Sequence, residues 1–380
     1  MNWTYMKKLL FILCFWSSVS FGQTNFKAPV LFPPSPDVAN MEKYGTYQVN
    51  YATGLPQISI PLYTVKQNDL EVPITLDYHA SGIKVTQDAG WIGLGWSLNA
   101  GGQISRQVMG NKPDETPTVG YLFRGAPLPS DPITDPLTAA GIDYLDQLYR
   151  GNYDAEPDIF SYSFPGKGGK FFFDQNDQFK PKVIPYDPIR INFTGGVFNV
   201  LNERGVAYDF QTKEQTQNNS SPTVTSAWML NKITSANKKD EIEFLYTSRY
   251  GVTYHDETQY VVVTDRISQQ GGSAGVSPPA VSVSHIQATE YKLDVIKFKN
   301  GRVKFHLDNR LDGFATPVPQ KKLITITVES YNSITNLYEV VKTISLIQTY
   351  FIKGSDQTSR RLRLDEVQIK DASATPTPVQ

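Results

Sequence analysis

Cysteine is almost absent from this chain, since Cys14 is the only one in 380 residues. It lies in a short apolar run that follows two lysines, and small and polar residues come next, at positions 17–22. This succession of charged, apolar and small residues is typical of a cleaved export signal. We therefore expect residues 1–22 to be removed. The mature chain then has no disulfide, and no thiolate for catalysis or metal binding.

Long apolar runs are absent as well. The run at residues 9–16 is much shorter than the roughly 20 residues that a membrane-spanning helix requires. Leu13 precedes Cys14, at a position where lipoprotein processing requires a small residue. We therefore expect a protein that is secreted or held at the cell surface, without a stable membrane span and without a lipid anchor.

Basic and acidic residues are almost equal in number, with 36 Lys and Arg and 37 Asp and Glu, so neither charge dominates the chain. The basic residues are scattered and form no stripe with interleaved aromatics, so the sequence argues against nucleic acid as a partner. The histidines are scattered too and lack the spacing of a zinc or iron site; they are His79, His255, His285 and His306. We expect no cofactor, no metal and no catalytic site, and hence not an enzyme.

Helix signals are scarce. The best lies at residues 136–150, where Thr134 and Asp135 can cap a helix and Pro136 suits its first position. The apolar side chains expected on one face of this helix are Leu145, Leu148 and Tyr149.

Apolar residues instead alternate with polar ones along most of the chain. This period of two is typical of antiparallel strands with one buried and one wet face. The clearest series are Ile58, Ile60 and Leu62; Val72, Ile74, Leu76 and Tyr78; Ile242, Phe244 and Tyr246; Val303, Phe305 and Leu307; and Ile324, Ile326 and Val328. The sequence predicts an all-β fold of mostly antiparallel, hairpin-rich sheets with one short helix.

Proline, glycine and polar clusters divide the chain into segments. A chain beyond about 250–300 residues usually forms more than one core, so we expect two β blocks. The predicted segments are an extended leader at 23–43, a first β block at 44–110, a Pro-rich connector with the helix at 111–158, a second β block of hairpins at 159–371, and a C-terminal tail at 372–380.

The second block contains a weak internal repeat. Residues 230–233 and 242–244 resemble residues 293–296 and 303–305, and residues 364–367 resemble the first arm of a third copy. Asn300 and Gly301 separate the arms of the middle copy, which is a strong hairpin signal. The repeat predicts hairpins laid side by side, although chance similarity between amphipathic strands explains it too.

The most distinctive stretch runs from residue 90 to residue 106. Read as a strand, it places large residues on one face, among them Trp96, and small residues such as Gly93 on the other, where a second backbone can approach closely. Its glycines do not open a helix as in a phosphate loop, and Asn99 breaks the nucleophile-elbow pattern. We therefore assign a structural role to its motif residues, which are Trp91, Gly93, Gly95, Trp96, Ser97 and Arg106.

Several segments together resemble one family of exported proteins. Residues 51–62, 78–85 and 93–98 look like the N-terminal region of Rhs/YD-repeat proteins of Gram-negative bacteria, and residues 156–162 with 169–174 resemble the same proteins further along. The sequence Gly-Leu-Gly-Trp-Ser-Leu at 93–98, followed by Ile-Ser-Arg, is also similar to toxin-complex B components and virulence-plasmid B proteins.

The resemblance implies a role as a scaffold. In that family the N-terminal region precedes YD hairpin repeats that coil into a hollow β shell around a toxin or effector. This chain stops at Gln380 without such repeats, so we expect a truncated or orphan module. Its expected partners are a downstream YD-repeat shell, an effector, or a second copy bound through the strand edge at residues 362–369, for which the sequence offers no following partner strand.

Two alternatives from other classes stay open. One is a glycan-binding or adhesive surface module, which a row of solvent-facing aromatic residues would favour. The other is a secreted carbohydrate-active enzyme, which two carboxylates facing each other across a cleft would favour.

Overall fold

The structure is a computed structural model. It describes residues 58–83, 87–110, 112–122, 139–218, 222–247, 250–260, 280–312, 319–355, 359–372 and 377–379, all of which belong to one compact unit, Leu31–Gln380. The predicted export segment at residues 1–22 and the leader at 23–43 lie outside the described residues.

The predicted fold class is confirmed, because the described residues form two antiparallel sheets with one α-helix. The small sheet has the order β1–β2–β3, with β1 (Ile58–Gln67), β2 (Leu70–Tyr78) and β3 (Trp96–Asn99). A 3-10 turn, η1 (Gln175–Asp177), is the one other helical element of the described part.

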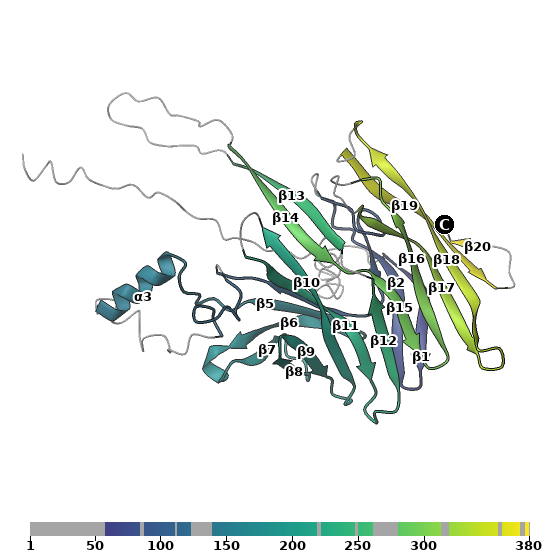
Figure 1. The fold of residues 1–380 in the computed structure, drawn as a ribbon, viewed down its shortest axis with the longest axis horizontal. Helices are drawn as coiled ribbons and strands as arrows, with labels where there is room; N and C mark the ends of the chain where they lie inside the picture. The colour runs from purple at the N-terminus through teal and green to yellow at the C-terminus, as the bar shows by residue number, and fades with distance from the viewer. Residues whose placement is uncertain are drawn as a thin grey trace, which may run out of the picture. The chain divides into compact units, whose positions relative to one another are not determined.

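The other strands make up the large sheet (Figure 1). They are β4 (Gln103–Gln107), β5 (Ile159–Phe164), β6 (Lys167–Asp174), β7 (Lys180–Ile184), β8 (Arg190–Thr194), β9 (Val197–Leu201), β10 (Ala207–Asn218), β11 (Val224–Thr234), β12 (Glu241–Tyr246), β13 (Tyr250–Tyr260), β14 (Ala280–Glu290), β15 (Leu293–Phe298), β16 (Gly301–Asn309), β17 (Lys321–Asn332), β18 (Leu337–Ile352), β19 (Arg360–Asp371) and β20 (Thr377–Val379).

The large sheet branches at two long strands. One run passes from β11 through β12, β15, β16, β17, β18 and β19 to β20. On the same side as β12, but over residues 227–229 instead of 232–234, β11 also pairs with β4, which leads on through β5 and β6 to β7. On its other side, β11 pairs with β10. Strand β10 pairs in turn with β9 and with β14. The hairpins of the predicted repeat do lie side by side, because β12 pairs with β15.

Most of the alternating residues are buried as predicted, whereas Ile58 at the start of β1 is exposed. On β2, Val72, Ile74 and Leu76 are fully buried. On β12, Ile242 and Phe244 are buried while Glu243 between them is exposed. Burial of one face in this way holds the register, because a slip by one residue would move every apolar side chain into water.

Both sheets contribute to one hydrophobic core. The same buried cluster contains Val72 and Ile74 of the small sheet and Phe244, Ile296 and Ile326 of the large one. Strand β4, which lies inside the predicted first block, pairs with β11 and so belongs to the large sheet. The predicted block boundaries stay a prediction, but the described parts of the two blocks pack against each other in a single core.

The predicted helix is confirmed as α3 (Ala139–Tyr149), but its predicted apolar face is wrong. Tyr144 is buried and stacks near Tyr153, with ring centroids 6.2 Å apart, while Leu145 and Tyr149 are exposed. The buried face of this helix is the one that carries Tyr144, so a contact outside the helix, and not its apolar period, marks that face.

Candidate functional site

The residues that precede β3 form a loop, which we call the Gly-Trp loop (residues 87–95), and not the strand that their alternation predicted. The loop is bound by strands from the other end of the chain. The Leu323 amide donates to the Trp91 carbonyl at 3.0 Å, and Nε2 of Gln348 donates to the Ile92 carbonyl at 2.8 Å. The backbone groups of the loop are thus paired with β17 and β18.

Strand β19 receives the next part of the loop. The Leu94 amide donates to the Leu362 carbonyl at 2.8 Å. Gly93, with φ of 144°, lies so close to β19 that an added Cβ would be 2.8 Å from the Leu364 nitrogen. Gly95, with φ of 79°, leaves no room either, since its Cβ would be 2.7 Å from the ring of Tyr78. The expected close approach of a second backbone to Gly93 is therefore present.

The two tryptophans have different environments. Trp91 is buried, and the Lys292 ammonium lies 5.6 Å from its ring centroid. Trp96 is only half-buried and packs on Tyr78, with centroids 5.2 Å apart. Ser97, placed by the sequence on the small-residue face, is buried at 4 % exposure, and its hydroxyl lies 3.5 Å from the Asp77 carbonyl. Burial of Ser97 agrees with the expected close approach to the small face, whereas Trp96 on the large face is less buried than Ser97.

Arg106 on β4 is the centre of a buried charged cluster. Its side chain is 1 % exposed, and its Nη1 lies 2.5 Å from Glu115 and 3.6 Å from Asp158. Its guanidinium carbon also lies 5.3 Å from the ring centroid of Trp228, which is a cation–π distance. Both acid partners come from the predicted connector at 111–158, Glu115 from its start and Asp158 from its last position, so this ion cluster joins β4 to both ends of the connector.

Two aspartates beside Arg106 are joined by a reciprocal pair of hydrogen bonds, in which the carboxyl group of each accepts from the backbone amide of the other. The Asp158 amide donates to Oδ1 of Asp114 at 2.9 Å, and the Asp114 amide donates to Oδ2 of Asp158 at 3.1 Å. Both residues are 0 % exposed. Oδ2 of Asp114 has no hydrogen-bond partner among the described residues.

The two carboxyl groups differ in acidity because their environments differ. Burial, followed by the charge of Asp158, raises the pKa of Asp114 to about 9. Burial also raises the pKa of Asp158, to about 7, but Arg106 and the amides of Met109 and Asp114 oppose this rise. Asp114 therefore keeps its proton at neutral pH, while Asp158 is the better counter-ion for Arg106.

The cluster joins two segments that are 50 residues apart in the chain. Arg106 ends the Ile-Ser-Arg motif, and Asp158 belongs to the segment at residues 156–162. The sequence pattern singled out Arg106 but not its partners Glu115 and Asp158. A signal was present, because Arg106 falls on the same strand face as the buried Ile104, and an inward-facing arginine requires an acidic partner.

The described residues hold no group of three or more His, Cys, Asp or Glu placed to bind a metal ion. His306 contacts Thr327 at 3.0 Å, and His79 contacts Ser81. His255 and His285 are register partners in the antiparallel pair of β13 and β14. No helix among the described residues has the length and apolar character needed to cross a membrane.

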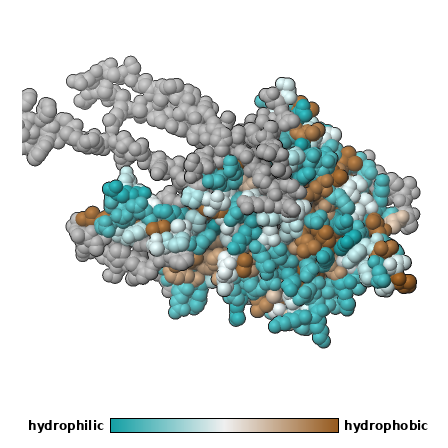
Figure 2. Space-filling model, viewed as in Figure 1, coloured by the Kyte–Doolittle hydropathy of each residue, from teal (hydrophilic) through white to brown (hydrophobic). Residues whose placement is uncertain are grey.

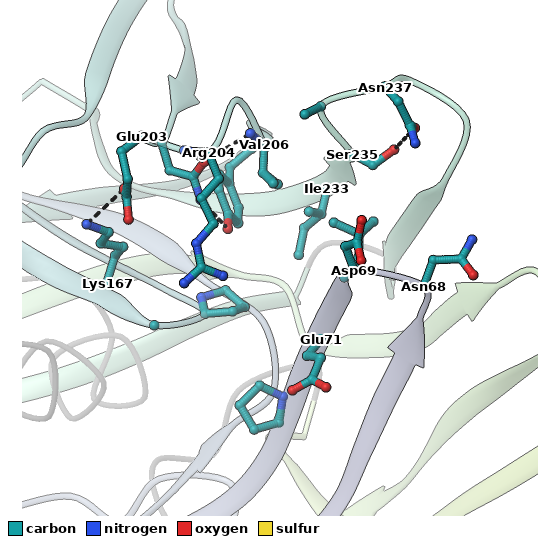
Figure 3. A pocket seen from close by; sticks show the side chains of 17 residues that line it. Asn68, Asp69, Glu71, Lys167, Glu203, Arg204, Val206, Ile233, Ser235 and Asn237 are labelled. Atoms are coloured by element: carbon teal, nitrogen blue, oxygen red, sulfur yellow. Dashed lines mark hydrogen bonds and ion pairs between the residues drawn. The ribbon is translucent and has the colours of Figure 1, made fainter.

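A pocket of about 930 Å³ lies where four hairpin turns meet, and we call it the hairpin-tip pocket (Figure 3). The turns are β1–β2 (Asn68 and Asp69), β5–β6 (Pro165 and Gly166), β9–β10 (Asn202 to Val206) and β11–β12 (Ser235 to Asn237). The strand residues Leu70, Glu71, Pro73, Lys167, Tyr208 and Ile233 complete its lining. No signal in the sequence analysis pointed to this pocket, since its residues lie far apart in the chain.

Comparison with protein families and with curated proteins finds no match for this chain. Among solved structures, the chain is similar to the N-terminal domain of effector protein SpvB from Salmonella typhimurium strain LT2, with a TM-score of 0.42 and 10% sequence identity. The similarity covers 84% of this chain and 100% of that domain.

Proposed function

We propose that this chain is a non-enzymatic β scaffold that works outside the cytoplasm, as a module of the kind found at the N-terminus of Rhs/YD-repeat proteins. One observation carries the proposal. The backbone of the Gly-Trp loop is bound by β17, β18 and β19, so the most distinctive motif of the chain holds the two sheets together.

Arg106 supports the same interpretation. A catalytic group must reach a substrate, whereas Arg106 is 1 % exposed and paired with Asp158 and Glu115 inside the protein. The buried carboxyl pair of Asp114 and Asp158 likewise touches protein and not solvent. The motif residues therefore serve packing and electrostatic balance.

The adhesive alternative has a smaller basis. Tyr331 and Tyr338 are about two-fifths exposed at the β17–β18 hairpin, with ring centroids 5.2 Å apart and Arg302 stacked on Tyr338 at 3.9 Å. Figure 2 shows apolar side chains in separate patches among hydrophilic ones on the face that it presents. An aromatic pair of this kind is a smaller feature than the row expected of a glycan-binding platform.

Export is tested by the mass of the protein. The full chain is produced in a Gram-negative host, and its intact mass is measured after recovery from the envelope and the medium. The proposal expects loss of residues 1–22. A folded product that keeps these residues inside the cytoplasm contradicts a role outside it.

The scaffold role is tested by binding. The purified mature chain is mixed with a purified YD-repeat polypeptide and analysed by light scattering after size separation, with an unrelated β protein of similar size as the control. A defined complex with the YD-repeat polypeptide alone is expected. Turnover of a polysaccharide or ester by the mature chain would overturn the proposal.

A further inference from the structure

The walls of the hairpin-tip pocket are fixed by hydrogen bonds before any ligand arrives. Nδ2 of Asn68 donates to Oδ1 of Asp240 at 2.8 Å, which ties the β1–β2 turn to the β11–β12 turn. The Lys299 amide donates to Oε1 of Gln67 at 2.9 Å, which ties the same turn to the β15–β16 hairpin. The bond from Asn68 also holds the pKa of Asp240 below its ordinary value, so this anchor stays charged.

The wall formed by the β9–β10 turn is equally well defined. Oδ1 of Asn202 accepts the amides of Arg204 at 3.0 Å and of Val206 at 2.9 Å, which fixes the backbone on both sides of Gly205. Arg204 is exposed, and its side chain extends from this turn into the pocket (Figure 3). A preformed backbone lowers the entropy that a ligand must overcome when it binds.

Arg204 carries a positive charge that the protein does not neutralise by contact. The neighbouring Glu203 forms an ion pair with Lys167 at 3.0 Å, and Lys167 forms another with Asp187 at 2.5 Å. Within the described part of the chain, the Arg204 guanidinium makes no hydrogen bond or ion pair. A guanidinium in this state is a ready donor for a bidentate bond to a carboxylate.

The opposite wall carries negative charge. Asp69, at the tip of the β1–β2 turn, makes no side-chain hydrogen bond or ion pair with another described residue. Glu71 lies beside it on β2 and has an ion pair with Lys66 at 2.8 Å, in which both side chains are more than half exposed. Exposed pairs of this kind are weak, so Glu71 remains available to a ligand cation. Figure 3 shows Asp69 and Glu71 on the side of the pocket that faces Arg204.

We propose that the hairpin-tip pocket binds a short zwitterionic peptide, whose carboxylate is held by Arg204 and whose ammonium group lies between Asp69 and Glu71. The pocket volume of about 930 Å³ falls within the range of small-ligand sites. Apolar surface from Pro73, Val206 and Ile233 is available to the backbone and small side chains between the two charges. This inference is independent of the scaffold role, because it concerns a surface that the Gly-Trp loop does not touch.

The test uses the mature protein and trialanine with free ends as the probe, measured by titration calorimetry. The matched probes are trialanine amide, N-acetyl-trialanine and a galacturonic acid trimer. The variants are Arg204→Gln and Asp69→Asn, with Lys353→Gln as a control charge removed outside the pocket. All these positions are exposed, and circular dichroism verifies that each variant is folded.

Trialanine is expected to bind the natural protein and the Lys353→Gln variant equally. Arg204→Gln should weaken this binding by about ten- to a hundredfold, the usual effect of losing a charged hydrogen-bond pair. Trialanine amide should bind both the natural protein and Arg204→Gln weakly and alike, because the carboxylate is already missing. In the same way, Asp69→Asn should weaken trialanine but leave N-acetyl-trialanine unchanged.

Three outcomes overturn the proposal. Trialanine does not bind at millimolar concentration, it binds Arg204→Gln as tightly as the natural protein, or the galacturonic acid trimer binds through Arg204 while trialanine does not. The last result would identify the pocket as a site for acidic glycans.

Discussion

At the scale of single residues, the buried cluster around Arg106 decides how the protein responds to pH. Because the folded-state pKa of Asp114 lies above its ordinary value of 3.8, the folded state binds this proton more tightly than the unfolded state. The stabilisation is complete at low pH and is lost as the pH rises from about 4 to about 9. Asp158 adds a similar loss that ends nearer pH 7. We therefore expect the protein to be less stable in weakly alkaline than in weakly acidic solution.

The substitution Asp114→Asn should remove most of this pH dependence above neutrality. An amide keeps the acceptor for the Asp158 amide and has no proton to lose, so the denaturant midpoint should change less between pH 6 and pH 9 than in the natural protein. The slope removed is at most about 1.4 kcal/mol per pH unit. Urea unfolding at each pH, followed by circular dichroism, measures it.

Asp158→Asn is the matched control, because the same chemical change is made on the partner carboxyl. It removes a counter-charge of Arg106, and Glu115 alone then faces the guanidinium. We expect a loss of about 3 kcal/mol at pH 8, since a buried charge without its partner is costly. Equal effects of the two substitutions would contradict the different roles assigned to the two aspartates.

Gly93 is a second residue at which one added carbon atom is expected to change the stability of the fold. Gly93→Ala adds a Cβ that meets the Leu364 nitrogen at 2.8 Å, at a φ that side chains rarely adopt. We expect a loss of at least about 2 kcal/mol. Gly195→Ala is the control, because Gly195 also has a positive φ but open space around it. Its cost should be only about 1 kcal/mol. Thermal unfolding of both variants separates the clash from the backbone strain.

At the scale of elements, the two tryptophans before and in β3 show how well the sequence pattern predicts burial. Alternation placed Trp96 in the core and left Trp91 undefined, whereas Trp91 is buried and Trp96 is half-buried. We expect Trp91→Ala to cost about 3–5 kcal/mol and Trp96→Ala clearly less. Denaturant midpoints of the two variants test this order. Equal costs would mean that the Gly-Trp loop adds little to the stability of the fold.

Much of the sheet structure could be predicted because its cause is local. Strands such as β2 and β12 have one buried face, and this burial appears in the sequence as an alternation of apolar and polar residues. The Gly-Trp loop could not be predicted, because its conformation depends on Leu323, Gln348 and Leu362, which are remote in the chain. For the same reason the hairpin-tip pocket left no sequence signal, since it is formed by turns from four hairpins.

At the C-terminal edge, the sequence predicted strand β19 but not the elements that pair with it. Strand β19 was expected to lack a following partner, but residues 367–369 pair with β20, and the Gly-Trp loop contacts the part around Leu362 and Leu364. A β-bulge at Asp365 of β19, opposite the step from Ile347 to Gln348 on β18, explains why the apolar residues of β19 change phase between Leu364 and Val367.

At the scale of the whole molecule, this edge decides whether the protein associates with itself. A variant that ends at Asp371 lacks β20 and exposes the unpaired backbone of β19, which can recruit another chain. We expect this variant to form more dimer and larger species than the chain that ends at Gln380, as measured by light scattering at tens of micromolar. If the two chains associate equally, self-association does not use the β19 edge.

The docking of the Gly-Trp loop also determines when, during synthesis of the chain, the fold can be completed. Ile92 and Gln348 are 256 residues apart in the chain, and the contact between Arg361 and Gln87 spans 274. At about 5–20 residues per second, a ribosome requires roughly 10–50 s to make the strands that the loop binds. During this interval the early segments cannot reach their final state. We therefore expect the nascent chain to stay open enough to be threaded through a membrane channel, with the last step of folding left to the far side.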